Sequence, residues 1–288
     1  MSSTATLRLA HCSDLHLLSL DGARILDFAN KRWIGGLNLL TSRGRHYHTE
    51  AFEDMVADFP GAGIDHVLCT GDVTNLALES EFEFVRRTLG EAGLPVTVIP
   101  GNHDAYTRGS VRSRRFEQYM GAFMEGERAS DTDYPFVQRL GGVALIGVST
   151  AIATLPLYAT GRVGKRQLER LERILEETKR EGLARVILIH HPVMPGAAKA
   201  RHDLLDLPDF AAVVERRGAE LILHGHEHRL IEGALAGPEA AVPVHGVASG
   251  TSRSIAKGRE GAFSLYQVAP GAIECERYLW TGEEFTPV

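Results

Sequence analysis

Short runs of apolar, often β-branched residues alternate along the chain with longer segments whose apolar residues recur at three- and four-residue steps. Runs of the first kind predict buried strands, and segments of the second kind predict helices that pack one face on a core. Strands are predicted at 7–13, 66–70, 96–99, 143–148, 186–190 and 221–224, and helices at 47–59, 79–91 and 165–181. This alternation is typical of an α/β protein, in which functional groups gather at the carboxyl ends of the strands.

Two later segments are less regular. Residues 108–133 are rich in charge and predict a helix with flanking loops over the strand ends. From 242 to 280 short strands follow one another without helices, which indicates an antiparallel end of a sheet. In the helix at 165–181, Glu169 is spaced to pair with Arg173 one turn later. No linker, low-complexity tract or internal repeat divides the chain, so residues 1–288 are interpreted as a single domain.

An amphipathic insertion at about 21–46 interrupts the alternation. Its apolar stripe and its basic residues are Ile25, Phe28, Ala29, Trp33, Leu37 and Leu40, with Arg24, Lys31, Arg32, Arg43 and Arg45. One interpretation is a helix that packs this stripe on the protein's own core. The alternative is an arm at 24–45 near a site entrance, which covers a bound substrate, makes peripheral contact with an anionic membrane or forms a homodimer.

Composition narrows the class of protein. The 288 residues are 44% hydrophobic and 24% charged, as expected of a globular domain with a large core. The 31 basic and 37 acidic residues give a net charge of −6, which argues against general nucleic-acid binding. Cys12, Cys69 and Cys275 form no CxxC pair, so a cysteine-built zinc site is excluded. With no signal-peptide pattern and no apolar span of about 18 residues, we expect a cytoplasmic protein, either free or peripheral at the membrane.

Polar motifs follow five of the predicted strands. They supply seven oxygen or nitrogen donors: Asp14, His16, Asp72, Asn102, His190, His226 and His228. Seven donors are enough for two adjacent metal ions if one carboxylate bridges them, and the mixed donor set suits Mn, Fe or Zn. Each motif alone has an ordinary structural explanation, such as a turn aspartate or an exposed histidine. Their common position at strand ends is what predicts a dinuclear metal site.

The ordered motifs D-x-H, G-D, G-N-H-D, H and G-H-x-H resemble those of the calcineurin-like metallophosphoesterase superfamily over residues 14–228. The resemblance implies an α/β fold that is a four-layer α/β/β/α sandwich of two mixed sheets flanked by helices. In this pattern Asp14, His16 and His228 hold one metal, Asn102, His190 and His226 hold the second, and Asp72 bridges them. His190 is favoured over His191 by its spacing to Pro192, and His224 is interpreted as a strand or supporting residue.

The resemblance also implies a metal-dependent phosphohydrolase with two divalent or mixed-valence metal ions (Mn, Fe or Zn). Two cations about 3.5 to 4 Å apart can hold a bridging hydroxide for in-line attack on phosphorus. His103, next to Asn102 in the chain, is predicted to be the general acid that protonates the leaving group.

Departures from related branches narrow the expected substrate, a small phosphate ester. Ser/Thr protein phosphatases read G-D-x-x-D-R-G, whereas this chain has Asn75 and Leu76 at the last Asp and Arg positions. Pyrophosphatases of the lipid A pathway carry Arg at the position of His103. The pattern looks most like bacterial class III cyclic nucleotide phosphodiesterases, so a phosphodiesterase is predicted. The alternative is a hydrolase of a lipid-linked or nucleotide-sugar phosphate ester at the membrane surface; a non-catalytic scaffold and a nuclease are less favoured.

Overall fold

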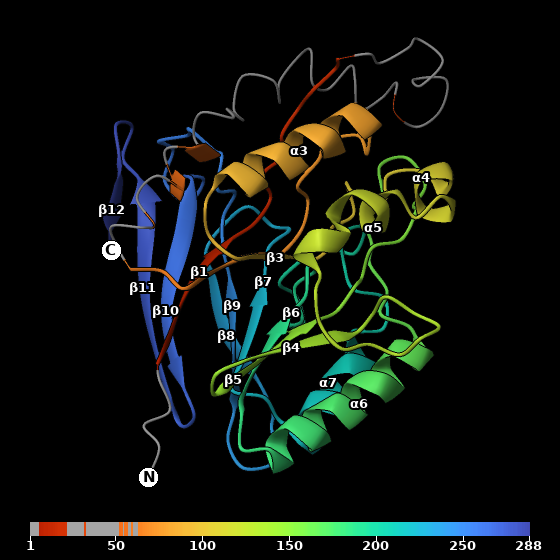
Figure 1. Ribbon diagram of the computed structural model, residues 1–288, viewed down its shortest axis with the longest axis vertical. Helices are drawn as coiled ribbons and strands as arrows, with labels where there is room; N and C mark the ends of the chain where they lie inside the picture. The colour runs from red at the N-terminus through yellow and green to blue at the C-terminus, as the bar shows by residue number, and fades with distance from the viewer. Residues whose placement is uncertain (1–5, 22–31, 33–51, 54, 57–58, 60–62) are drawn as a thin grey trace.

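The computed structural model shows two mixed β-sheets packed face to face, with helices on both outer sides (Figure 1). It describes residues 6–21, 32, 52–53, 55–56, 59 and 63–288. The predicted α/β fold of two mixed sheets flanked by helices is therefore confirmed.

The first sheet has the strand order β12-β11-β10-β1-β2-β3. Its strands are β1 (Leu7–Cys12), β2 (His66–Cys69), β3 (Val96–Val98), β10 (Ala262–Ala269), β11 (Ala272–Trp280) and β12 (Phe285–Pro287). The strands β1, β2 and β3 run parallel, so their carboxyl ends meet at one edge, and the other three extend the sheet as antiparallel strands beside β1.

The second sheet has the strand order β4-β5-β6-β7-β9-β8. Its strands are β4 (Phe136–Leu140), β5 (Val143–Gly147), β6 (Ala184–Leu188), β7 (Leu221–His224), β8 (Ile231–Leu235) and β9 (Val242–Gly246). The four central strands are parallel, and β4 and β8 pair antiparallel at the edges.

The prediction that 242–280 forms an antiparallel end of a sheet is confirmed for β10 and β11 and wrong for β9. β9 joins the second sheet parallel to β7, whereas β10 and β11 belong to the first sheet and pair antiparallel there. Alternating polarity along a strand shows which face is buried, but it does not specify which strand lies beside it.

The described helices are α3 (Glu79–Glu91), α4 (Arg108–Arg112), α5 (Arg115–Met120), the 3₁₀ helix η3 (Gly121–Phe123), α6 (Lys165–Arg180) and α7 (Leu207–Arg217). The predicted helices at 79–91 and 165–181 are confirmed. The single helix expected within 108–133 is wrong, because Arg114 has φ 52° and separates α4 from α5. In α6, Glu169 lies 3.9 Å from Lys165 in the preceding turn instead of pairing with Arg173.

The central strands β5, β6 and β7 of the second sheet are buried on both faces, which explains their uninterrupted apolar runs. Along β5, Val143 and Leu145 join the core between the sheets, whereas Ala144 and Ile146 face the core under α6 and α7. Successive side chains of a strand point to opposite faces, so one apolar run serves both layers.

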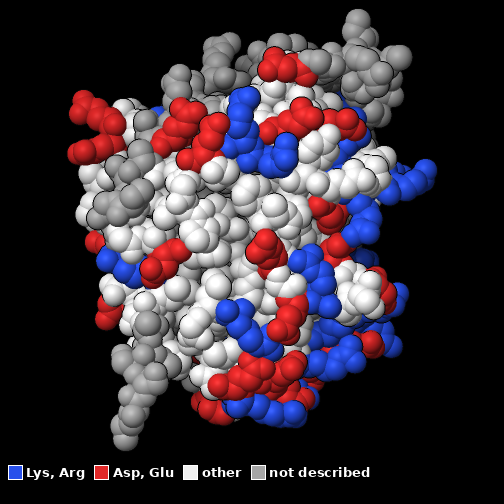
Figure 2. Space-filling model, in the orientation of Figure 1, with Lys and Arg blue, Asp and Glu red and all other residues white. Residues whose placement is uncertain are grey.

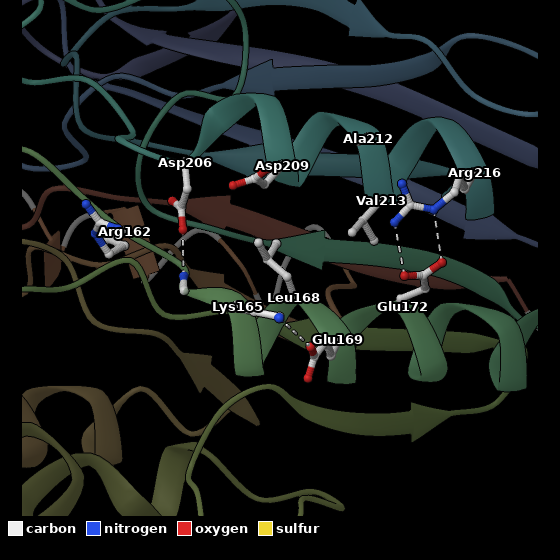
Figure 3. Close-up of a pocket in the computed structure, with 11 residues that line it drawn as sticks. Arg162, Lys165, Leu168, Glu169, Glu172, Asp206, Asp209, Ala212, Val213 and Arg216 are labelled. Carbon is white, nitrogen blue, oxygen red and sulfur yellow. Dashed lines mark hydrogen bonds and ion pairs between the residues drawn. The ribbon is translucent and has the colours of Figure 1, made fainter.

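The outer surface of α6 and α7 carries charge of both signs, and Figure 2 shows acidic and basic side chains interleaved over this part of the molecule. A groove of about 400 Å³ lies between the two helices (Figure 3). At one end the Asp206 carboxylate accepts hydrogen bonds from the main-chain N–H groups of Val163 and Gly164, at 3.0 and 2.7 Å. Along the groove Glu172 pairs with Arg216. No helix within the described ranges is long and apolar enough to cross a membrane.

Two described residues, Asp21 and Arg32, belong to the predicted insertion at 21–46. Arg32 is buried, and its guanidinium donates to the carbonyl oxygens of Leu76 and Ala77 at 2.7 and 2.8 Å. The apolar stripe and the rest of the proposed arm lie outside the described residues. In the predicted helix at 47–59, the described residues Phe52, Met55 and Phe59 are buried in the main core.

Glu81, at the start of α3, makes the stability of the protein depend on pH. Its carboxylate accepts hydrogen bonds from the main-chain N–H groups of Leu76 and Leu78, at 2.9 and 3.0 Å. Burial nevertheless raises the pKa of Glu81 from 4.5 to about 7. The folded state therefore binds this proton more tightly than the unfolded chain, so the stabilisation is complete below the unfolded pKa and is lost as the pH rises through about 7.

We expect Glu81→Gln to remove this dependence, because glutamine keeps an acceptor and cannot ionise. Between about pH 5 and about pH 8, the wild type should lose roughly 2 to 3 kcal/mol more unfolding free energy than the variant. Urea denaturation at the two pH values measures the difference. Glu83→Gln, on the exposed face of α3, is the matched control. Parallel pH curves for wild type and Glu81→Gln would contradict the assignment.

Candidate metal centre

The loops that follow β1 and β2 are hydrogen-bonded to each other directly beyond the strand ends. The main-chain N–H of Asp14 donates to the Gly71 carbonyl, and that of His16 donates to the Asp72 carbonyl, both at 2.9 Å. A second tie comes from Asn75, whose side-chain amide donates to the His16 carbonyl. These bonds bring the first two polar motifs of the sequence together.

Left-handed backbone is concentrated in these loops. Among the described residues other than glycine, eight have positive φ, and five of them are predicted ligands: Asp14, His16, Asp72, His226 and His228, with φ between 45° and 75°. Such conformations are strained for side chains with a Cβ atom and cost of order 1 kcal/mol or more each. Strain gathered at one place, on residues of one chemical kind, points to a functional site.

The first cluster joins Asp14, His16 and His228. Asp14 Oδ1 lies 3.2 Å from His228 Nε2 and 3.9 Å from His16 Nε2, and the two imidazole nitrogens are 3.1 Å apart. Asp14 Oδ1 is buried and makes no hydrogen bond to the described residues. A buried carboxylate oxygen without a donor is costly. A cation held by these three side chains would satisfy it.

The second cluster joins Asp72, Asn102, His190 and His226. His190 Nε2 lies 3.4 Å from Asp72 Oδ2, 3.1 Å from Asn102 Oδ1 and 3.2 Å from His226 Nδ1. His190 Nδ1 contacts the Thr70 carbonyl at 2.8 Å, and His226 Nε2 contacts the carbonyl of His202 at 3.0 Å.

Those two carbonyls can only accept, so each takes the ring proton of its histidine. The lone pair of a neutral His190 Nε2 then faces Asp72 Oδ2 and Asn102 Oδ1, and His226 Nδ1 faces His190 Nε2. Histidines that bind metal ions usually donate the N–H of the other ring nitrogen to a carbonyl or carboxylate oxygen in this way. Burial would lower the pKa of His190, but Asp72 and Asp14 raise it to about 9, so this ring must release a proton when a metal ion binds.

Asp72 also belongs to a third group, with His16 and His103, whose donor atoms lie within 4.8 Å of one another. It therefore lies between the two clusters. Bridging by Asp72 and the metal roles of all seven donors stay predictions, but the structure brings all seven into one site.

The histidines of the site lower the pKa values of its two aspartates. Burial by itself would raise the pKa of Asp14, but His228 and His190 lower it to about 2. Burial likewise opposes ionisation of Asp72, yet His190 and His103 hold its pKa well below the usual value. Both carboxylates are therefore ionised near neutral pH and attract positive charge into the site.

Supporting residues connect the loops without entering the donor set. The Asp104 carboxylate accepts hydrogen bonds from the main-chain N–H groups of Gly101 and Thr74, both at 2.9 Å, which holds the Asp72 loop against the Asn102 loop. Ser249 donates to the Asp14 carbonyl at 2.6 Å, and Thr251 donates to the Leu15 carbonyl at 2.7 Å. Sequence reasoning missed Ser249 and Thr251, because a hydroxyl that binds a main-chain carbonyl has no recognisable spacing.

Glycine is required where these loops approach most closely. A Cβ atom at Gly225 would collide with Ser13 Oγ and Asp14 Oδ2, and one at Gly101 would collide with Asp72 Oδ1. The glycines of G-N-H-D and G-H-x-H thus allow close packing around the two carboxylates, and Gly71 of G-D makes room for the Gly101 main chain and the His190 ring.

His103 is held beside Asp72. Its main-chain N–H donates to Asp72 Oδ1 at 2.7 Å, and its ring Nδ1 donates to the Asn75 carbonyl at 2.6 Å. The ring stands edge-on to His16, with centroids 4.8 Å apart. In Ser/Thr protein phosphatases the motif has an aspartate at position 75; here the main-chain carbonyl of Asn75 orients the histidine.

The neighbouring histidines lie around the clusters. His191 contacts Thr150 Oγ1 at 2.7 Å and the Ala159 carbonyl at 3.0 Å, so both of its nitrogens are engaged away from the donor set. His224 ends β7 and donates from Nδ1 to the Gly225 carbonyl, and burial lowers its pKa to about 4. His202, to which the sequence assigned no role, supplies the carbonyl that orients His226.

Several solved structures have the same fold as this chain. A dimetal phosphatase from Danio rerio superposes with a TM-score of 0.67 at 13% identity, covering 98% of each chain. The purple acid phosphatase PPD1 of yellow lupin gives 0.62 at 12% identity, and 99% of this chain covers 53% of that one. The protein TT1561 of Thermus thermophilus gives 0.52 at 15% identity, covering 94% of this chain and 98% of that one. A search of curated proteins finds no match to the sequence.

The family comparison covers most of the chain. The model of the calcineurin-like phosphoesterases matches residues 7–230, a range that contains all seven donors and His103. With two mixed sheets, helices on both sides and this match, the chain belongs to the calcineurin-like phosphoesterase family.

Proposed function

We propose that this phosphoester hydrolase is a phosphodiesterase served by two bound metal ions. The observation that carries the proposal is the pair of donor clusters, Asp14 with His16 and His228, and Asp72 with His190 and His226, meeting at the strand ends. The dimetal phosphatase from Danio rerio and the lupin purple acid phosphatase, which share the fold, support a dinuclear site.

The residues fit metal ions in number and in kind. Four imidazole nitrogens, two carboxylates and one amide oxygen form a mixed set that suits Mn, Fe or Zn. The buried Asp14 Oδ1 and the two tautomers set by main-chain carbonyls are what a cation site needs. When bound, a metal pair supplies an activated water for attack on phosphorus and neutralises the phosphoryl oxygens.

His103 would supply the proton for the leaving alkoxide. Its Nδ1 is held by the Asn75 carbonyl, which orients the ring beside His16 and Asp72. A positioned proton donor is most useful for an alkoxide, which leaves poorly without protonation.

A diester is favoured over a protein phosphomonoester by position 76. The related protein phosphatases have a phosphate-binding arginine there, whereas Leu76 is 1% exposed and points into the core. A monoester carries about two negative charges near neutral pH and a diester carries one, so the diester needs less cationic compensation.

A lipid-linked phosphate ester is the second candidate. It is favoured by the exposed side chains of Leu155 and Leu157, which lie just before Ala159, whose carbonyl contacts His191 Nε2. A nuclease is disfavoured by the net charge of −6, and a scaffold is disfavoured by the complete donor set.

Turnover assays with added Mn²⁺ test the proposal. We expect bis-p-nitrophenyl phosphate to be hydrolysed with a higher kcat/KM than p-nitrophenyl phosphate, and chelation to abolish both reactions. Single-stranded DNA should remain intact. A higher kcat/KM for the monoester would contradict the diesterase assignment, and no turnover by a metal-loaded protein would indicate a scaffold.

A further inference from the structure

The loop between β5 and α6 contains an apolar turn that faces solvent. Tyr158 N–H donates to the Leu155 carbonyl at 3.1 Å across Pro156 and Leu157, closing a four-residue turn. The exposed fractions are 68% for Leu155, 71% for Leu157 and 47% for Tyr158. The turn therefore exposes most of Leu155 and Leu157 and about half of Tyr158.

Leu157 also has a strained backbone. Its φ is 68°, at a turn position after proline where glycine or asparagine is the usual residue. A branched side chain at positive φ costs stability, and Leu157 recovers none of that cost by burial. An apolar partner that covered Leu157 would offset this cost.

A second loop, between β6 and α7, is bonded to the first. The N–H groups of Ala159 and Gly161 donate to the carbonyls of Arg201 and Asp203, at 2.8 and 3.1 Å, and Leu205 N–H donates back to the Gly161 carbonyl at 2.9 Å. Leu205 is 49% exposed. We call Leu155, Leu157, Tyr158 and Leu205 the apolar rim.

The same main chain reaches the metal centre. The Ala159 carbonyl contacts His191 Nε2 at 3.0 Å, and the His191 ring lies 4.3 Å from the ring of His226. The carbonyl of His202, in the second loop, orients His226. The two loops that carry the apolar rim are thus joined through His191 and His202 to the second donor cluster.

The charge of these loops is opposite to that of the whole chain. Residues 149–164 and 191–202 contain no acidic residue, and the second stretch carries the exposed cations Lys199 and Arg201. Exposed Arg229 adds a third, with its guanidinium on the Ala197 carbonyl at 2.9 Å. Two acids lie nearby: Asp203 directs its carboxylate to the N–H of Leu204 at 3.0 Å, and Glu227 lies 3.8 Å from His202 Nδ1. In a chain of net charge −6, this apolar and basic surface complements an anionic one.

We propose that the apolar rim docks on an anionic lipid surface and presents the metal centre to a phosphodiester carried on a lipid. Docking follows from the exposed apolar turn and its basic surroundings. The substrate class rests in addition on the proposed phosphodiesterase function.

Sedimentation with vesicles of equal parts phosphatidylcholine and phosphatidylglycerol tests docking. The double variant Leu155→Ser with Leu157→Asn removes two apolar side chains and keeps a residue that tolerates positive φ, so its melting temperature should not fall. We expect its vesicle affinity to drop about 100-fold, because each buried leucine contributes roughly tenfold or more. Val288→Ser, which changes a side chain 70% exposed at the C-terminus, should bind like wild type.

Further arms separate the possible outcomes. Lys199→Glu should weaken binding to these vesicles, and pure phosphatidylcholine should bind wild type poorly. Wild type that stays in the supernatant, or a double variant that binds like wild type, would overturn the proposal. A wild-type dimer that the double variant dissociates, without vesicle binding, would assign the rim to a second copy of the chain.

Activity on the two physical forms of substrate completes the test. The ratio of kcat/KM for a vesicle-borne phosphodiester to that for bis-p-nitrophenyl phosphate should fall in the double variant. Vesicle binding without turnover of either ester would leave docking standing and would refute the hydrolase. Turnover of the soluble ester without vesicle binding would support the hydrolase and refute docking.

Discussion

Asp72→Ala should lose phosphodiester turnover to background and release at least one metal ion per chain. Asp72 lies between the two donor clusters, with Oδ2 3.4 Å from His190 Nε2 and a place in the group with His16 and His103. Loss of a residue that merely supports a ligand weakens metal binding by about 10- to 100-fold, so loss of a shared ligand should exceed that. Elemental analysis and turnover of bis-p-nitrophenyl phosphate measure the two effects.

Two further variants make this test specific. Asp72→Asn keeps the shape of the side chain and removes its charge, so a large loss in this variant would show that the negative charge matters. Asp209→Ala, which removes an exposed carboxylate on α7, should leave metal content and turnover unchanged. A fully active wild type with one metal ion per chain would refute the bridging role.

His103→Ala should keep both metal ions and lose about 10²- to 10⁴-fold in kcat, the usual contribution of a positioned proton donor. The loss should be smaller for bis-p-nitrophenyl phosphate than for an alkyl diester, because nitrophenolate leaves readily without a proton. Comparison of kcat for the two esters, in wild type and variant, measures this difference.

The competing role of His103 is metal binding, since one of its ring nitrogens lies within 4.8 Å of donor atoms of His16 and Asp72. That role predicts loss of a metal ion and an equal loss of kcat for both esters. His245→Ala is the matched control, because His245 packs on Tyr266 from β9 and belongs to neither donor cluster. It should change neither metal content nor the ratio of the two rates.

The sequence by itself predicted the strands that carry the site and the seven side chains that gather at their ends. Apolar runs such as Val143–Gly147 are buried on both faces, and a strand of that kind leaves a local pattern in the sequence. The gathering of the seven candidate donors was predictable for a related reason. Parallel strands such as β1, β2 and β3 end at a common edge, so the polar residues that directly follow them are brought together once the strands pair.

Only the tertiary structure decided how these parts are joined. In the structure the strands from Val242 onward are divided between two sheets. The sequence did not predict this division, because alternating polarity along a strand does not specify which strand pairs with it. The structure also assigns main-chain carbonyls to orient His103, His190 and His226. Every residue except proline has the same amide and carbonyl, so their use leaves no trace in residue type. The apolar rim was also decided by the tertiary structure. The exposure of Leu157 and its positive φ result from the path of the loop across the fold, which the residues Leu155 to Tyr158 do not specify by themselves.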